Sequence, residues 1–179
     1  VKSLPKEMFL YDWLPQNQVE WYNNKICSLR KNIKVKTGLQ HLHRSLQNYA
    51  GTFEEMKKFS PDSKAKIRSK IIGGVAEQLT QVLCEVEWAL ESLNATTPEK
   101  VAADLSKNWN NSPDNTRLLT QDWGVISLCQ TFLGDWTLIV DRLNKKTVCK
   151  RPSWISRKKK ANSKRTSRAP MSNGPRPLV

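Results

Sequence analysis

Residues 71–90 read IIGGVAEQLTQVLCEVEWAL and give the strongest indication of the fold. Apolar side chains recur in and just beyond this stretch at spacings of three and four residues: Ile72, Val75, Leu79, Val82, Val86, Ala89 and Leu93, with Ile71, Leu83 and Leu90 widening the stripe. Such spacing is typical of a helix that buries one face. Gly73 and Gly74 inside it each cost about 1 kcal/mol of helix stability relative to alanine. They predict a kink or a close helix crossing at that point.

Two apolar series with the same spacing lie upstream. The first follows Pro15 and comprises Val19, Tyr22, Ile26, Leu29 and Ile33. The second is out of phase with the first by one residue and comprises Val35, Leu39, Leu42, Leu46, Tyr49, Phe53 and Met56. A single straight helix cannot present both coiled-coil-like seams to one partner. The sequence therefore predicts either a kink near Gly38 or two helices that meet around residues 36–38.

A last long helix is predicted towards residue 143. Its stripe comprises Ile126, Cys129, Leu133, Trp136, Val140 and Leu143, widened by Phe132 and Ile139. Three hydroxyl-proline-acid motifs, at residues 60–62, 97–99 and 112–114, are typical helix starts, because the hydroxyl caps a backbone N–H and the acid meets the positive end of the helix dipole. Proline-directed phosphorylation is their alternative use. A shorter helix is expected from Thr97, with Val101, Leu105 and Trp109 on one stripe.

These segments predict an all-α fold, an antiparallel bundle of about four helices. We expect an N-terminal arm (1–14), a helical bundle domain (15–143) and a disordered basic C-terminal tail (144–179). No apolar run approaches the roughly 18 residues of a transmembrane helix, so no membrane span is expected.

Positive charge is concentrated at the end of the chain. The 179 residues carry a net charge of +14, and residues 144–179 hold 12 lysines or arginines and no acid. Such a composition cannot form a core, and it favours binding to nucleic acid phosphates or to a nuclear import receptor. The predicted binding residues are Lys145, Lys146, Lys150, Arg151, Trp154, Arg157, Lys158, Lys159, Lys160, Lys164, Arg165 and Arg168. The acidic surface of tubulin is a second candidate target, whereas few apolar residues accompany these charges and no membrane contact is expected.

Two of the seven tryptophans are candidate partner anchors. Trp21 and Trp88 lie beside the apolar stripes of their segments rather than on them. An amphipathic ring in such a position faces a groove or a protein partner. Packing at the edge of the core is the alternative role of both rings.

No motif in the sequence fixes a chemistry. The cysteines at 27, 84, 129 and 149 are widely spaced and are expected to be buried thiols, with two disulfides as the alternative in a secreted protein. His41 and His43 are two residues apart and would point to opposite sides of a helix, so they cannot share a metal ion. We therefore expect no enzyme activity, no metal, no cofactor and no small-molecule substrate.

A helical body, a basic tail and the lack of a catalytic motif together indicate a binding protein. We expect a nuclear scaffold or adaptor subunit that docks protein partners through the helical body and contacts DNA, RNA or an import receptor through the tail. A centrosomal or microtubule-associated subunit is one alternative. A secreted four-helix ligand with a basic tail is another, and the glycosylation sequon at Asn94, Ala95 and Thr96 would fit it.

Overall fold

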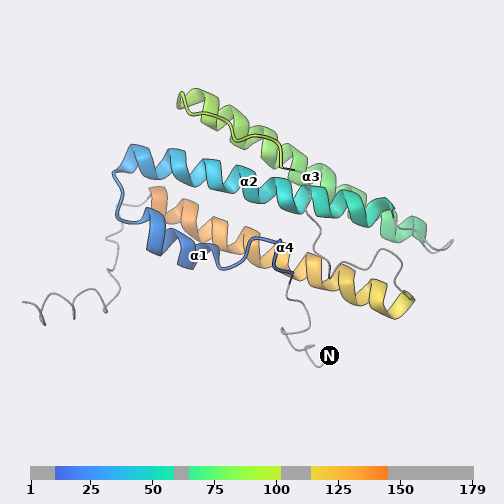
Figure 1. Ribbon diagram of the computed structural model, residues 1–179. Coiled ribbons are helices and arrows are strands. Elements are labelled where there is room, and N and C mark those ends of the chain that lie inside the picture. The colour runs from blue at the N-terminus through green and yellow to red at the C-terminus, as the bar shows by residue number, and fades with distance from the viewer. Residues whose placement is uncertain (1–10, 59–64, 102–113, 145–179) are drawn as a thin grey trace, which may run out of the picture. The chain divides into compact units, whose positions relative to one another are not determined.

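The computed structural model describes residues 11–58, 65–101 and 114–144 (Figure 1). All of them belong to the first of the two units into which the chain divides, residues 1–147. The regular elements of these ranges are helices α1 (Gln18–Trp21), α2 (Lys31–Lys58), α3 (Ala65–Ser92) and α4 (Asn115–Asn144) and the π-helix η2 (Tyr22–Ile26). The predicted all-α fold is confirmed for this part of the chain.

Helix α2 is at the centre of the packing. It contacts α3 along one side and α4 along another, while α1 packs against α4 and η2 against α2 (Figure 1). Residue numbers fall in α3 and α4 as they rise in α2, as four contacting pairs show: His43 with Glu87, Met56 with Arg68, His41 with Trp136, and Tyr49 with Phe132. The predicted antiparallel arrangement of packed helices is therefore confirmed.

The stripe predicted for α2 forms the core over most of its length. Leu42, Leu46, Tyr49, Phe53 and Met56 are all buried. Full burial of such a side chain is worth about 1.5–3 kcal/mol. The tyrosine keeps its hydroxyl satisfied, because Tyr49 donates a hydrogen bond to the Pro15 carbonyl oxygen at 3.0 Å.

The predicted break near Gly38 is wrong. Gly38 is buried inside the continuous helix α2, and the chain leaves helical geometry earlier, between Cys27 and Arg30. The π-helix before this break holds more residues per turn than an α-helix. The one-residue phase shift between the two apolar series therefore falls at residues 22–30. Ile33, at the end of the first series, is largely exposed.

Helix α3 runs without interruption through Gly73 and Gly74, so the predicted kink is wrong. A Cβ added at Gly73 would lie 3.8 Å from the Lys57 Cε atom, which is an ordinary contact, and one at Gly74 would meet open space. Neither glycine marks a crossing too close for alanine. The buried residues of α3 are Ile72, Ala76, Leu79, Val86 and Leu90, whereas the predicted stripe members Val82 and Leu93 are exposed.

Asp114, the described residue of the motif at 112–114, starts a helix, whereas the motif at 97–99 does not. Asp114 caps α4, because the Arg117 N–H donates to Asp114 Oδ1 at 2.9 Å, so the acid performs the capping predicted for the hydroxyl. Residues 95–101 are not helical, and the predicted helix start at Thr97 is wrong. Here the chain lies along α2, where Gln40 donates to the Thr96 carbonyl oxygen at 2.8 Å. The motif at 60–62 and the residues Leu105 and Trp109 lie outside the described ranges.

The core stripe of α4 differs from the predicted one. Its buried apolar residues are Leu118, Val125, Cys129, Phe132, Trp136 and Ile139. Ile126, Leu133 and Val140 were predicted to be buried and are instead exposed. Helix α4 carries two neighbouring apolar stripes, and periodicity alone does not show which of them faces α2. At the other end of the described chain, Tyr11 and Leu14 are buried, so packing of the body already includes residue 11 of the predicted N-terminal arm.

Candidate functional site

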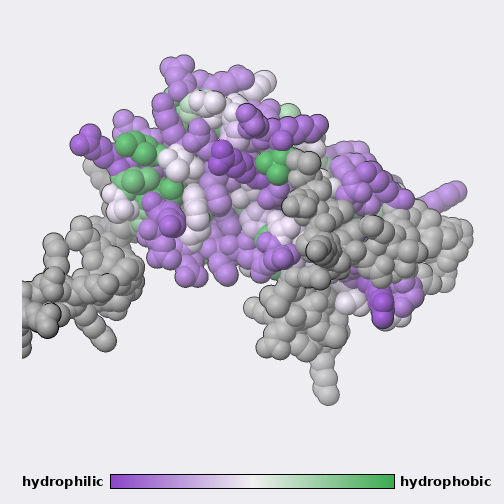
Figure 2. All heavy atoms as spheres, in the orientation of Figure 1, coloured by the Kyte–Doolittle hydropathy of each residue, from purple (hydrophilic) through white to green (hydrophobic). Residues whose placement is uncertain are grey.

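Large apolar side chains remain exposed on the outer faces of α3 and α4. They are Ile67, Ile71, Val82 and Trp88 on α3, Leu93 directly after it, and Leu119, Trp123, Ile126, Leu133, Leu138 and Val140 on α4. On the face shown in Figure 2, hydrophobic side chains gather in a few patches among hydrophilic ones. Apolar side chains that gather on a surface are typical of a binding face.

Trp88 has the exposure that a partner anchor requires. It is 72% exposed, and the exposed Glu85 and Glu91 lie about one helical turn to either side. Tryptophan is enriched among the residues that dominate protein interfaces. An indole between two carboxylates suits a partner that presents apolar and basic side chains.

Trp21, the second predicted anchor, has a different environment. It is half-buried and its ring stacks on His41 with 3.6 Å between the centroids and 13° between the planes. The ring of Trp136 lies 6.1 Å away, and its buried Nε1 has no hydrogen-bond partner. Trp21 belongs to an aromatic cluster between α1, α2 and α4. No ring contact found among the described residues joins it to Trp88, so the structure does not bring the two predicted anchors together.

The Asp135 carboxylate on α4 binds the N-terminus of α1, next to this aromatic cluster. Asp135 Oδ2 accepts hydrogen bonds from the backbone N–H groups of Gln18 at 2.8 Å and Val19 at 3.4 Å. It thereby caps a helix whose own N-cap residue, Asn17, makes no side-chain cap. The Gln18 side chain in turn accepts a hydrogen bond from His41 Nε2 at 2.9 Å. Burial, with the nearby Arg44 charge, lowers the pKa of His41 to about 4, so this imidazole is neutral at physiological pH.

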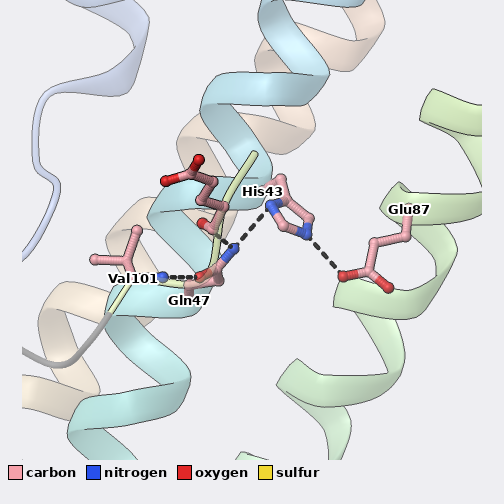
Figure 3. Close-up of polar contacts among 5 residues, drawn as sticks. His43, Gln47, Glu87 and Val101 are labelled. Atoms are coloured by element: carbon pink, nitrogen blue, oxygen red, sulfur yellow. Dashed lines mark hydrogen bonds and ion pairs between the residues drawn. The ribbon is translucent and has the colours of Figure 1, made fainter. Parts of the chain in front are cut away.

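His43 lies on the opposite side of α2 and is almost fully buried. Gln47 Nε2 donates to His43 Nδ1 at 2.9 Å, and His43 Nε2 is 2.8 Å from Glu87 Oε1 (Figure 3). Because the Val101 N–H donates to Gln47 Oε1, the amide orientation is fixed, and the proton of the neutral imidazole is on Nε2. The arrangement joins α2, α3 and residues 99–101. Both ring nitrogens of His43 are therefore engaged by side chains of the helical body.

A buried ion pair, which no sequence motif predicts, lies near the C-terminal end of α2 and the N-terminal ends of α3 and α4. Arg68 Nη2 donates to Asp122 Oδ1 at 2.7 Å, and Nε donates to Oδ2 of the same carboxylate. Arg68 Nη1 also donates to the Met56 carbonyl oxygen at 3.1 Å. Both charged groups are largely shielded from solvent, with 14% of the arginine and 9% of the aspartate side chain exposed. One guanidinium thus connects α2, α3 and α4.

The cysteines do not all match the prediction of buried thiols. Cys27 is disulfide-bonded, and Cys84 has a free thiol that is exposed. Cys129 is a buried thiol as predicted, and burial raises its pKa to about 11, which makes it unreactive. Cys149 lies outside the described residues. Within the described residues, no three histidine, cysteine, aspartate or glutamate side chains are grouped to hold a metal ion.

One surface hollow is lined by Arg44 and residues 96–101, where the segment after α3 lies along α2. Its charged lining residues are Arg44, Glu99 and Lys100.

The predicted tail site lies outside the described residues. This holds for all twelve of its members: Lys145, Lys146, Lys150, Arg151, Trp154, Arg157, Lys158, Lys159, Lys160, Lys164, Arg165 and Arg168.

Helix α4 is long and apolar enough to cross a membrane by length and composition alone. The core helix of a soluble protein has the same properties. Asp122 and Asp135 on this helix bond to α3 and α1, which fits a helix packed in a protein core.

No family model matches the chain, and neither a curated protein nor a solved structure is similar to it.

Proposed function

We propose that this chain is a non-enzymatic binding protein, a scaffold or adaptor that docks a protein partner on the outer face of α3. The exposure of Trp88 carries this proposal. A tryptophan exposes a large apolar area to water, and burying it in a partner's pocket is strongly favourable. The flanking Glu85 and Glu91 suit a partner with basic side chains around that pocket.

The matched test compares two exposed positions on α3. Trp88→Ala should reduce capture of the main partner from the source cells at least tenfold, since truncation of an interface hot spot costs about 2 kcal/mol or more. Gln81 is also exposed and lies two turns earlier on α3, and Gln81→Ala should leave capture unchanged. Circular dichroism of both variants should match that of the wild type. Equal capture by Trp88→Ala and wild type would refute docking at this residue.

The basic C-terminal residues supply the second half of the proposal, which is contact with DNA, RNA or a nuclear import receptor. Support comes from the charge of residues 144–179, twelve basic side chains without one acid. Binding through released counterions weakens steeply with salt. Deleting residues 144–179 should abolish salt-sensitive nucleic acid binding and nuclear accumulation, and unchanged localisation would contradict this assignment. Competition by tubulin tails would favour the centrosomal or microtubule-associated alternative.

A secreted helical ligand is the second candidate, and the disulfide bond of Cys27 favours it. Disulfides persist in oxidising compartments and are rare in the nucleus and cytosol. The sequon residue Asn94 is exposed, although its left-handed backbone (φ 48°) at the end of α3 is itself a common reason for asparagine. The exposed free thiol of Cys84 fits a reducing compartment better.

Peptide mapping without reduction separates the two candidates. In protein isolated from its own source, a disulfide-bonded Cys27 together with a glycan on Asn94 would establish the secreted ligand. A reduced Cys27 and an unmodified Asn94 in protein from nuclear extract would establish the intracellular adaptor.

A further inference from the structure

The outer face of α4 carries a second apolar stripe, separate from the stripe in the core. It comprises Leu119, Trp123, Ile126, Leu133 and Val140, and the uncharged polar residues Gln130 and Thr137 complete it, so that successive positions are spaced by four, three, four, three, four and three residues. All seven are exposed. Alternating spacings of three and four are those of a coiled-coil seam, and three consecutive heptads form a seam of about 32 Å.

This face is free of charge along the same length. Between residues 118 and 140 the only charged side chains are Asp122 and Asp135, and both are turned to other helices through their bonds to Arg68 and to the start of α1. Exposed positions beside the seam, Thr131 and Leu138, are also uncharged. The exposed positions of α3, by contrast, include several lysines and glutamates. A solvated helix face normally carries such charges.

We propose that a second copy of this chain packs on this face, with the two α4 helices antiparallel. Two-fold symmetry about the middle of the seam places Gln130 opposite Gln130 of the other copy, where the two amides can hydrogen-bond to each other. A polar residue at one central seam position is a known means of fixing register.

The charges at the ends of α4 favour the antiparallel direction. Arg117, which also pairs with Asp114 at 3.7 Å, lies just before the seam, Asp141 lies just after it, and both are exposed. Antiparallel pairing brings Arg117 of each copy near Asp141 of the other, so two attractive pairs form. Parallel pairing would instead bring like charges together at both ends. The helix dipoles also oppose one another favourably in the antiparallel pair.

This inference is independent of the proposed docking at Trp88, because that residue lies on α3. A seam of three heptads is at the small end of stable interfaces, and we expect a dissociation constant on the order of 1–100 µM.

Site-directed cross-linking tests both the pairing and its direction. All variants are made in the full chain with Cys84→Ser, which removes the exposed thiol. Gln130→Cys should form a disulfide-linked dimer for most of the protein under mild oxidation, because the symmetry axis passes this residue. Thr131→Cys is exposed but off the seam, and Leu119→Cys is brought next to its own copy only in a parallel pair. Both should cross-link at least tenfold less.

Other outcomes would overturn the proposal. Cross-linking at Leu119→Cys as strong as that at Gln130→Cys would establish a parallel pair, because every seam position then lies beside its own copy. Equal and weak cross-linking at all three positions would show that the chains meet only by random collision, and the proposed dimer would be refuted. A chain that stays monomeric and binds vesicles of neutral phosphatidylcholine through α4 would show that lipid, not a second copy, covers this face. Because Ile126 is exposed, Ile126→Glu should retain the helical circular dichroism signal. It should raise the dissociation constant of the dimer at least tenfold.

Discussion

Replacing His41 by phenylalanine should make the stability of the helical body less sensitive to acid. The pKa of His41 is about 4 in the folded chain against an ordinary value of 6.5. Between these values the unfolded chain binds a proton that the folded chain does not, so the free energy of unfolding falls as pH drops from about 6.5 towards 4. At pH 5 the two pKa values give a loss of about 2 kcal/mol relative to pH 8. Solvent screening of the half-buried ring reduces this to roughly 1 kcal/mol.

Phenylalanine keeps the flat ring that stacks on Trp21 but cannot take up a proton. Urea denaturation of wild type and His41→Phe at pH 8 and pH 5 gives four free energies of unfolding. The loss on acidification should be greater by about 1–2 kcal/mol in the wild type than in the variant. An equal loss in both proteins would show that His41 is not buried against Trp21 and Trp136 as described.

Three further experiments test the packing and capping of α4. Phe132→Ala should lower the free energy of unfolding by about 3–5 kcal/mol, whereas Leu133→Ala on the next residue should cost less than about 1 kcal/mol at low protein concentration; equal costs in urea titrations would show that the two faces were assigned wrongly. Arg68→Met should cost about 3–5 kcal/mol by leaving the Asp122 carboxylate buried and unpaired, and adding Asp122→Leu should recover much of that loss; no recovery in the double variant would contradict a buried pair. Asp114→Ala should lower the thermal midpoint through loss of about 1 kcal/mol of helix capping, and an unchanged midpoint would refute the cap.

Helical periodicity predicts most of this fold because α2 and α3 each place one strong stripe against the other. The stripe from Leu42 to Met56 is buried as the spacing indicates. The stripe of α4 could not be assigned, because Val125 and Ile126, Phe132 and Leu133, and Ile139 and Val140 are adjacent apolar pairs. Only the position of α2 decides which member of each pair is buried.

Polar contacts between distant segments were beyond the reach of sequence analysis. Arg68 and Asp122 are separated by 54 residues, and neither stands in a motif. The π-helix that ends at Ile26 shifts the phase of the apolar stripe, and no proline or glycine marks its position in the sequence. At the candidate site, the position of Trp88 beside its stripe predicted its exposure, whereas the same argument for Trp21 did not foresee the stack on His41.

In the proposed dimer, one face of α4 holds the helical body together and the neighbouring exposed face binds a second copy of the chain. Sedimentation equilibrium of the 179-residue chain over about a hundredfold range of concentration tests this pairing. The molar mass should rise from 20.6 kDa towards twice that value, while Ile126→Glu stays at the lower mass throughout. A wild-type protein that remains at 20.6 kDa at every concentration would contradict it.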